Sequence, residues 1–163
     1  MTSAECQRGG TPVGFITELG SIEAASVIYL RLWCNGPNSQ TDVLKDFVSS
    51  LGASQGERAI NAFEELCRLC AQYGRRPLMR HTVNCKCLGA DEACFANFIS
   101  AATDGNRNDA MLIATLLVRP DVAPLITELA ANFGLALRRM NLCAPKDLMG
   151  TEPITSSQTT TIH

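Results

Sequence analysis

Glycine- and proline-containing breaks divide this chain of 163 residues into segments that each have the length of a helix. The breaks are 34–38 (CNGPN), Gly52, Gly74, 103–109 (TDGNRND) and Pro120. Between them, apolar residues recur every three or four positions, as they do on one face of an α-helix. Aromatic residues make up only 6% of the chain, which favours helices over a β-sandwich. The sequence therefore predicts an all-α fold, a single compact domain of five or six helices.

Capping residues set the expected helix boundaries. Ser21, Ser39 and Asp91 are the expected N-caps, because their side chains can accept a hydrogen bond from an unpaired backbone N–H. Ser54 and Glu57 have the spacing of a capping box, in which each side chain satisfies the backbone of the other residue. Helix starts are therefore expected at or next to these positions.

The segment 110–118 (AMLIATLLV) is apolar almost all round, a pattern typical of a helix that is buried on every side. We therefore expect this helix near the centre of the domain, followed after Pro120 by another helix from Asp121 to Gly134. The expected core residues are large apolar residues on the predicted helix faces. They are Ile28, Leu32, Trp33, Phe47, Leu51, Phe63, Leu66, Phe98, Leu112, Leu116 and Leu129.

Both ends of the chain lack a helical pattern. Residues 1–18 are expected to form an irregular N-terminal segment, residues 19–143 the helical domain, and residues 144–163 a flexible tail. Residues from Gly150 onward have no apolar face, so we expect them to be dispensable for folding. The first ten residues contain no apolar run typical of a signal peptide. We expect a cytoplasmic protein that does not enter the membrane, in which the eight cysteines stay reduced.

The stretch HTVNCKCLGADEAC (81–94) concentrates the residue types that bind transition metals. It contains His81, Cys85, Cys87 and Cys94, and three cysteines with one histidine are a common ligand set for structural zinc. The surrounding segment 75–90 is long and has no periodic pattern, so it needs a staple or a function. We predict that these four residues bind one structural zinc ion. An iron–sulfur cluster is the less favoured cofactor.

The same stretch has two other interpretations. In the first, the two loop cysteines are free thiols, the imidazole is solvated, and Cys94 is buried beside Phe95. In the second, the C-x-C pair forms a reversible disulfide. Elsewhere, Cys67 and Cys70 form a C-x2-C pair, but they lie on the apolar face of a predicted helix and are interpreted as core residues.

A formal net charge of −2 indicates no strong field that would steer the protein toward nucleic acid. Four basic residues, Arg75, Arg76, Arg80 and Lys86, do lie close together in a segment without acids. Because aromatic residues to stack on bases are missing, nucleic-acid binding is not the favoured interpretation. Arg75 and Arg76 are expected instead to complement the carbonyl groups at the end of the preceding helix.

These observations favour a non-catalytic, metal-stapled regulatory or interaction module that binds an unknown protein partner. One alternative is a metal- or thiol-dependent enzyme that uses the loop 81–94, with Asp91 or Glu92 as a base. The other is a helical scaffold without a metal. The chain is similar to small helical proteins of bacteria, a resemblance that ties it to no named family and implies no function.

Overall fold

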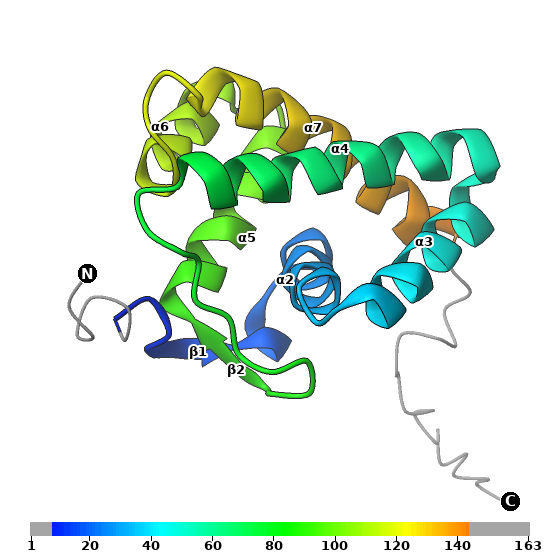
Figure 1. Cartoon of the computed structure of the whole chain (residues 1–163), viewed down its shortest axis with the longest axis horizontal. Helices are drawn as coiled ribbons and strands as arrows, with labels where there is room; N and C mark the ends of the chain where they lie inside the picture. The colour runs from blue at the N-terminus through cyan, green and yellow to red at the C-terminus, as the bar shows by residue number, and fades with distance from the viewer. Residues whose placement is uncertain (1–7, 144–163) are drawn as a thin grey trace, which may run out of the picture.

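The computed structural model describes residues 8–143 and contains six α-helices and one small sheet in that range (Figure 1). It confirms the predicted all-α fold. The elements in chain order are β1 (Pro12–Phe15), the 3-10 helix η1 (Ile16–Glu18), α2 (Ser21–Trp33), α3 (Pro37–Leu51), α4 (Ala53–Tyr73), β2 (Cys87–Gly89), α5 (Ala90–Thr103), α6 (Arg107–Leu117) and α7 (Ala123–Cys143). None of these helices is long and apolar enough to cross a bilayer. The predicted tail, including Gly150, lies outside the described residues.

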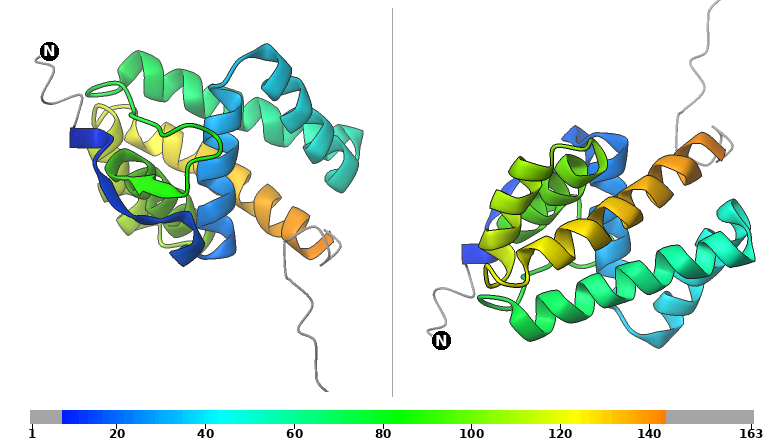
Figure 2. Two further views of the ribbon diagram at one scale, coloured as in Figure 1. Left: turned by 90° about the horizontal axis from the view of Figure 1, so that it is seen from below. Right: turned by 90° about the horizontal axis from the view of Figure 1, so that it is seen from above.

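Helix α7 occupies the centre of the domain and contacts each of the other five α-helices of the described region. It runs antiparallel to α4, and the two long helices lie side by side (Figure 2). Helix α3 packs on α4 at one end of this pair, and α5 with α6 packs on α7 toward the other. Helix α2 crosses beside them and joins the two halves through contacts to α5 and α3.

Stacked aromatic rings from three helices form the middle of the core. The rings of Phe63 and Phe133 lie 4.2 Å apart between centroids, and those of Phe47 and Phe133 lie 6.0 Å apart. Trp33 meets Phe63 edge-on at 5.7 Å. Such pairs add specific geometry to the burial of large apolar area.

Most of the predicted core residues are buried or pack against the core. Phe47, Phe63, Leu66 and Phe98 are fully buried. Four others are partly buried and lie against the core, namely Leu32, Trp33, Leu51 and Leu129. The prediction was wrong for Ile28, Leu112 and Leu116, which are 40%, 68% and 67% exposed.

The prediction that segment 110–118 forms the central helix was also wrong. Helix α6 lies at the edge of the domain and faces the core through Ala110, Ala114 and Leu117. The small alanine side chains let α6 pack closely, while Leu112 and Leu116 point away from the core. A run of apolar residues does not show how many other helices will pack around it. In this fold α5 and α7 pack against one face of α6 only.

Glycines rather than the predicted serines and Asp91 precede four of the helices. Gly20, Gly36, Gly52 and Gly89 are the N-cap residues of α2, α3, α4 and α5. Gly52 separates α3 from α4 as a single residue with a φ of 85°, a conformation that favours glycine. Because α4 therefore begins at Ala53, the predicted Ser54–Glu57 capping box does not form.

The predicted irregular segment 1–18 and the predicted loop 75–90 each contribute one strand. Strands β1 and β2 pair antiparallel, with Phe15 opposite Cys87 and Pro12 opposite Gly89. Strands of three or four residues are too short to show an alternating pattern. Their pairing depends on contacts between distant parts of the chain, which a local pattern does not contain.

Helix α7 runs straight through Gly134, where the sequence predicts a helix end with at most a turn or two more over residues 135–140. The helix continues for nine further residues, to Cys143. At this point α7 crosses α5 so closely that a Cβ atom on Gly134 would overlap Thr103 Oγ1. The glycine is therefore required by close helix packing.

We expect Gly134→Ala to lower the free energy of unfolding by about 1–3 kcal/mol, the usual cost of overpacking. Urea denaturation followed by circular dichroism measures this change. In a Thr103→Ala background the same substitution should cost less, because Oγ1 and Cγ2 of Thr103 are then absent. If Gly134→Ala instead stabilised the protein by about 1 kcal/mol, as at an uncrowded helix position, the close packing would be refuted.

Candidate functional site

Arg31 connects α2 to the segment between α4 and α5. Its side chain is completely buried and donates five hydrogen bonds, one for each of its five N–H groups. Two go to the carboxylate of Glu92 on α5, at 2.7 and 2.8 Å. The other three go to backbone carbonyls of the segment, those of Thr82, Cys85 and Cys87, at 3.2, 2.6 and 2.7 Å. Arg31 therefore fixes the path of residues 82–87.

Glu92 accepts two further hydrogen bonds in addition to those from Arg31. The backbone N–H groups of His81 and Gly89 each donate to it at 2.9 Å. Burial by itself raises the pKa of Glu92, but the hydrogen bonds from Arg31, Gly89 and His81 outweigh it, and the pKa is lowered. Glu92 is therefore ionised and fully satisfied at neutral pH.

A second ion pair holds the beginning of the same segment. Arg76 binds the carboxylate of Asp91 in a bidentate manner, with Nη1 to Oδ2 at 2.7 Å. The backbone N–H of Met79 donates to the same carboxylate at 2.8 Å. Gly9 packs so closely over this pair that any side chain there would collide with Asp91 and Arg76.

The expected role of the two arginines next to α4 was therefore wrong. Arg76 pairs with Asp91, and Arg75 donates through Nε to the carbonyl of Thr115 on α6. Backbone hydrogen bonds also tie this region to the end of α6, with Arg75 N donating to Leu117 O and Arg119 N to Tyr73 O. Neither arginine contact was visible in the sequence, because Arg76 and Asp91 are 15 positions apart and Arg75 and Thr115 are 40 positions apart.

Of the four predicted zinc ligands, the structure places His81 in contact with Cys85, and Cys87 beside Cys85. His81 Nδ1 lies 3.7 Å from Cys85 Sγ, and His81 Nε2 lies 2.9 Å from the carbonyl of Gly10. Because a carbonyl only accepts, Nε2 is the donor to Gly10, and Nδ1 is the ring nitrogen that faces the Cys85 thiol. Burial, followed by the hydrogen bond and charge of Cys85, raises the pKa of Cys87.

Cys94 has a different environment from the other three. It lies on α5, partly buried against the core. Burial and the charge of Asp91 raise its pKa, and Arg76 opposes them. Among residues 8–143, no group of three or more His, Cys, Asp or Glu side chains is placed to hold a metal ion. The zinc site of His81, Cys85, Cys87 and Cys94 therefore stays a prediction.

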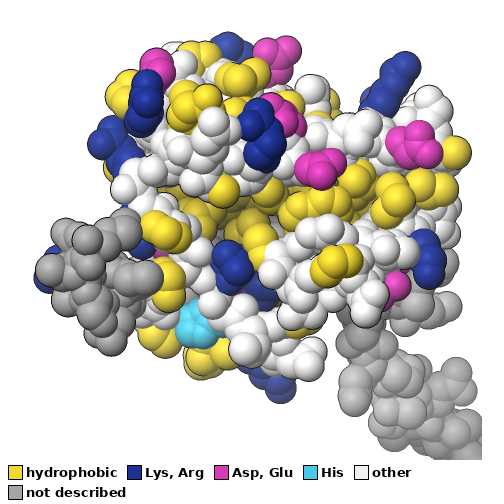
Figure 3. Space-filling view, in the orientation of Figure 1, with side chains coloured by type: hydrophobic (Ala, Val, Ile, Leu, Met, Phe, Trp, Pro, Cys, Tyr) yellow, Lys and Arg dark blue, Asp and Glu magenta, His cyan; other side chains and the backbone are white. Residues whose placement is uncertain are grey.

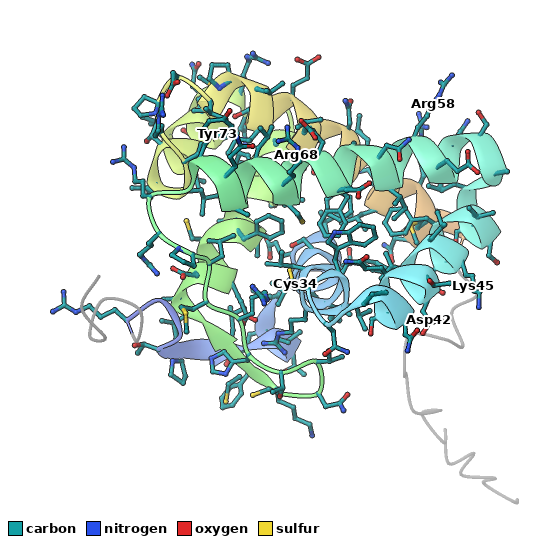
Figure 4. The ribbon with its side chains drawn as sticks, in the orientation of Figure 1. Cys34, Asp42, Lys45, Arg58, Arg68 and Tyr73 are labelled. Carbon is teal, nitrogen blue, oxygen red and sulfur yellow. The ribbon has the colours of Figure 1, made fainter. Side chains whose placement is uncertain are left out.

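An apolar hollow of about 290 Å³ lies where α2, α4 and the segment 77–80 meet. We call it the thiol-lined hollow. Its walls are mainly apolar and include three cysteines; they are Leu30, Cys34, Cys67, Cys70, Ala71, Pro77, Leu78, Arg80 and Phe95. Figure 3 shows apolar side chains gathered in a band across this face of the molecule, and Figure 4 shows Cys34 beside α2.

The cysteines of the thiol-lined hollow are neutral at physiological pH. Burial raises the pKa of Cys70 to about 12 and that of Cys67 well above its ordinary value. Burial also raises the pKa of Cys34, against the opposing charge of Arg80. The core interpretation of the C-x2-C pair is confirmed for Cys70, which is 5% exposed, and Cys67 is partly buried and packs against the same core. Both side chains also line the hollow. The sequence signal for the hollow was weak, since Cys34 is distant from this pair in the chain.

Comparison with known proteins finds no match. No protein-family model, no curated protein and no solved structure matches this chain. The function is therefore argued from the geometry of the ion pairs, the loop and the thiol-lined hollow.

We expect Glu92→Gln to lower the free energy of unfolding at pH 7 by about 3 kcal/mol, because it leaves the buried charge of Arg31 without its counter-ion. Since folding lowers the pKa of Glu92, its stabilisation is present above its ordinary pKa of 4.5 and is lost as the pH falls further. The stability difference between wild type and variant should therefore shrink below about pH 4.5.

Urea denaturation at pH 7, 5 and 3.5 measures this pH dependence. Glu64→Gln is the matched control, because it removes the same charge from an exposed position on α4. A constant difference between wild type and Glu92→Gln over the whole range would contradict an ionised, stabilising Glu92.

Proposed function

We propose that this protein is a non-catalytic helical regulatory module that binds a small ligand with an apolar body in the thiol-lined hollow. The observation that carries the proposal is that one wall of the hollow is preformed. Pro77, Leu78 and Arg80 belong to a segment that two ion pairs hold in place. Preformed apolar concavities of roughly 300 Å³ or more are the usual form of small-molecule sites.

The size of the hollow supports a small ligand over a folded partner. A stable protein interface buries about 800 Å² on each partner, mostly on a broad surface. A hollow of about 290 Å³ instead has the volume of about ten water molecules at roughly 30 Å³ each. An unknown protein partner, if it binds here, would insert a single side chain.

The surroundings of the acids and thiols support binding over catalysis. In the enzyme alternative, Asp91 or Glu92 would serve as a base, but both are engaged in ion pairs with arginines. The hollow's thiols are protonated, and a thiol reacts as a nucleophile only in its thiolate form. The hollow therefore has the properties of an apolar binding surface.

We expect octan-1-ol to cause saturable chemical-shift changes in residues that line the thiol-lined hollow, measured by ¹H–¹⁵N NMR on the full chain. Ala71→Trp, which fills the hollow from its exposed α4 side, should abolish them. Asn61→Trp is the matched control, because it places the same side chain on an exposed part of α4 outside the hollow. The proposal fails if binding is not saturable, or if both variants respond alike.

Zinc binding by the loop is a second proposal, supported by the proximity of His81 and Cys85. The 3.7 Å contact between Nδ1 and Sγ places two donors of suitable type side by side, with Cys87 hydrogen-bonded to the same thiol. Zinc in a structural site requires four donors at about 2.0–2.3 Å, so the loop and Cys94 would have to close further around the ion. In that case, zinc would fasten β2 to the beginning of α5.

Protein purified without chelator is expected to contain about one equivalent of zinc by elemental analysis. Cys87→Ser should lose the metal and destabilise the domain. Cys67→Ala is the control and should keep the metal, at a packing cost of about 1–2 kcal/mol. A metal content below about a tenth of an equivalent would refute the zinc proposal without affecting the proposal for the hollow.

A further inference from the structure

We propose that the ligand of the thiol-lined hollow is a small monoanion with an aliphatic or aromatic body, such as a medium-chain carboxylate, and that Arg80 binds its charged group. This inference rests on the proposed function, because it names the class of ligand for the same hollow. It depends on the charge of the lining, on the environment of Arg80 and on the size of the hollow.

Among the described residues that line the hollow, Arg80 is the one that carries a charge. The remaining lining residues are Leu, Ala, Pro, Phe and Cys, and burial keeps the thiols neutral. A single cation at an otherwise apolar wall matches a ligand that has one negative charge and an apolar body. A neutral apolar ligand would gain no affinity from this charge.

The guanidinium of Arg80 is available for a ligand. Its hydrogen bond within the described residues is a long one, from Nη1 to the carbonyl of Leu78 at 3.4 Å. Five other arginines, Arg31, Arg68, Arg76, Arg119 and Arg138, form the ion pairs of residues 8–143. Arg80 forms no ion pair in that range, and it is exposed at the protein surface.

The charge of Arg80 is felt inside the hollow. It opposes the rise in pKa of both Cys34, which directly follows α2, and Cys67 on α4. The exposed acid Glu64 also acts on Cys67, with a smaller effect than Arg80. The hollow therefore has a positive side, and that side lies at the segment 77–80.

The size of the hollow sets the length of the apolar body. A volume of about 290 Å³ accommodates a chain of about eight carbon atoms, given roughly 30 Å³ for each water-sized unit. Each methylene that becomes buried should strengthen binding by about fourfold. Octanoate is therefore a suitable probe, and butyrate is the short-chain control.

Isothermal titration calorimetry on the full chain, with octanoate, octan-1-ol and butyrate, tests this inference. We expect octanoate to bind at least about tenfold more tightly than octan-1-ol, and butyrate to bind much more weakly than octanoate. Rising salt should weaken octanoate binding and leave octan-1-ol binding nearly unchanged, because salt screens only the charged contact. These comparisons require no variant.

Variants then assign the charge effect to Arg80. Arg80→Met should reduce octanoate affinity to that of octan-1-ol, whereas Arg80→Lys should retain part of the preference. Lys86→Met is the matched control, because it removes the same charge from an exposed position on the same segment outside the hollow. Only the variants at position 80 should change the preference for the anion.

The outcomes separate the proposed ligand binding in the hollow from the proposed role of Arg80. Equal affinities for octanoate and octan-1-ol overturn the role of Arg80 and leave the proposed function standing. Equal loss of octanoate affinity in Arg80→Met and Lys86→Met also overturns that role, because the effect would then come from net charge. If neither ligand binds saturably, the proposed function fails together with this inference.

Discussion

The buried ion pair between Arg31 and Glu92 is the interaction on which the rest of the candidate site depends. A buried charge without a partner costs several kcal/mol, so each residue is tolerated in the interior only because the other is present. The guanidinium also directs its remaining N–H groups at three backbone carbonyls of residues 82–87. Because the guanidinium is planar and rigid, satisfying all five donors fixes α2, α5 and this segment relative to one another.

This arrangement explains how a long irregular segment can form one wall of a cavity. At its start, the segment is tied to the end of α6 through Gly74 and Val118, and the Arg76–Asp91 ion pair follows. Near its end, Arg31 and the strand pairing of β2 hold it. Between these anchors, Leu78 and Arg80 are presented toward α4, where Cys67 and Cys70 form the opposite wall. The wall is therefore in place before any ligand binds.

The sequence indicated that the segment 75–90 needs a staple or a function, and a metal ion was the predicted staple. In the structure, two ion-paired arginines, Arg31 and Arg76, hold the segment. In the sequence, Asp91 was the expected N-cap of a helix and Glu92 the residue after it, a region where a negative charge suits the helix dipole. They occupy the first turn of α5, but their carboxylates also bind Arg76 and Arg31 from elsewhere in the chain. Nothing in the sequence indicated that Arg31 is buried. An arginine next to apolar residues of a helix can be exposed or buried, and only the position of its partner, here Glu92, decides between the two.

The sequence by itself determined which segments are helical, because apolar spacing and glycine or proline breaks act through contacts between residues that are close in the chain. It also indicated much of the core, since large apolar residues on one helix face must be buried somewhere. Only the tertiary structure decided that α7 rather than α6 is central, that Gly134 is a crossing point, and that Arg31 meets Glu92 across 61 positions. These features depend on which helix faces meet, and that choice is a balance of packing and charge over the whole chain.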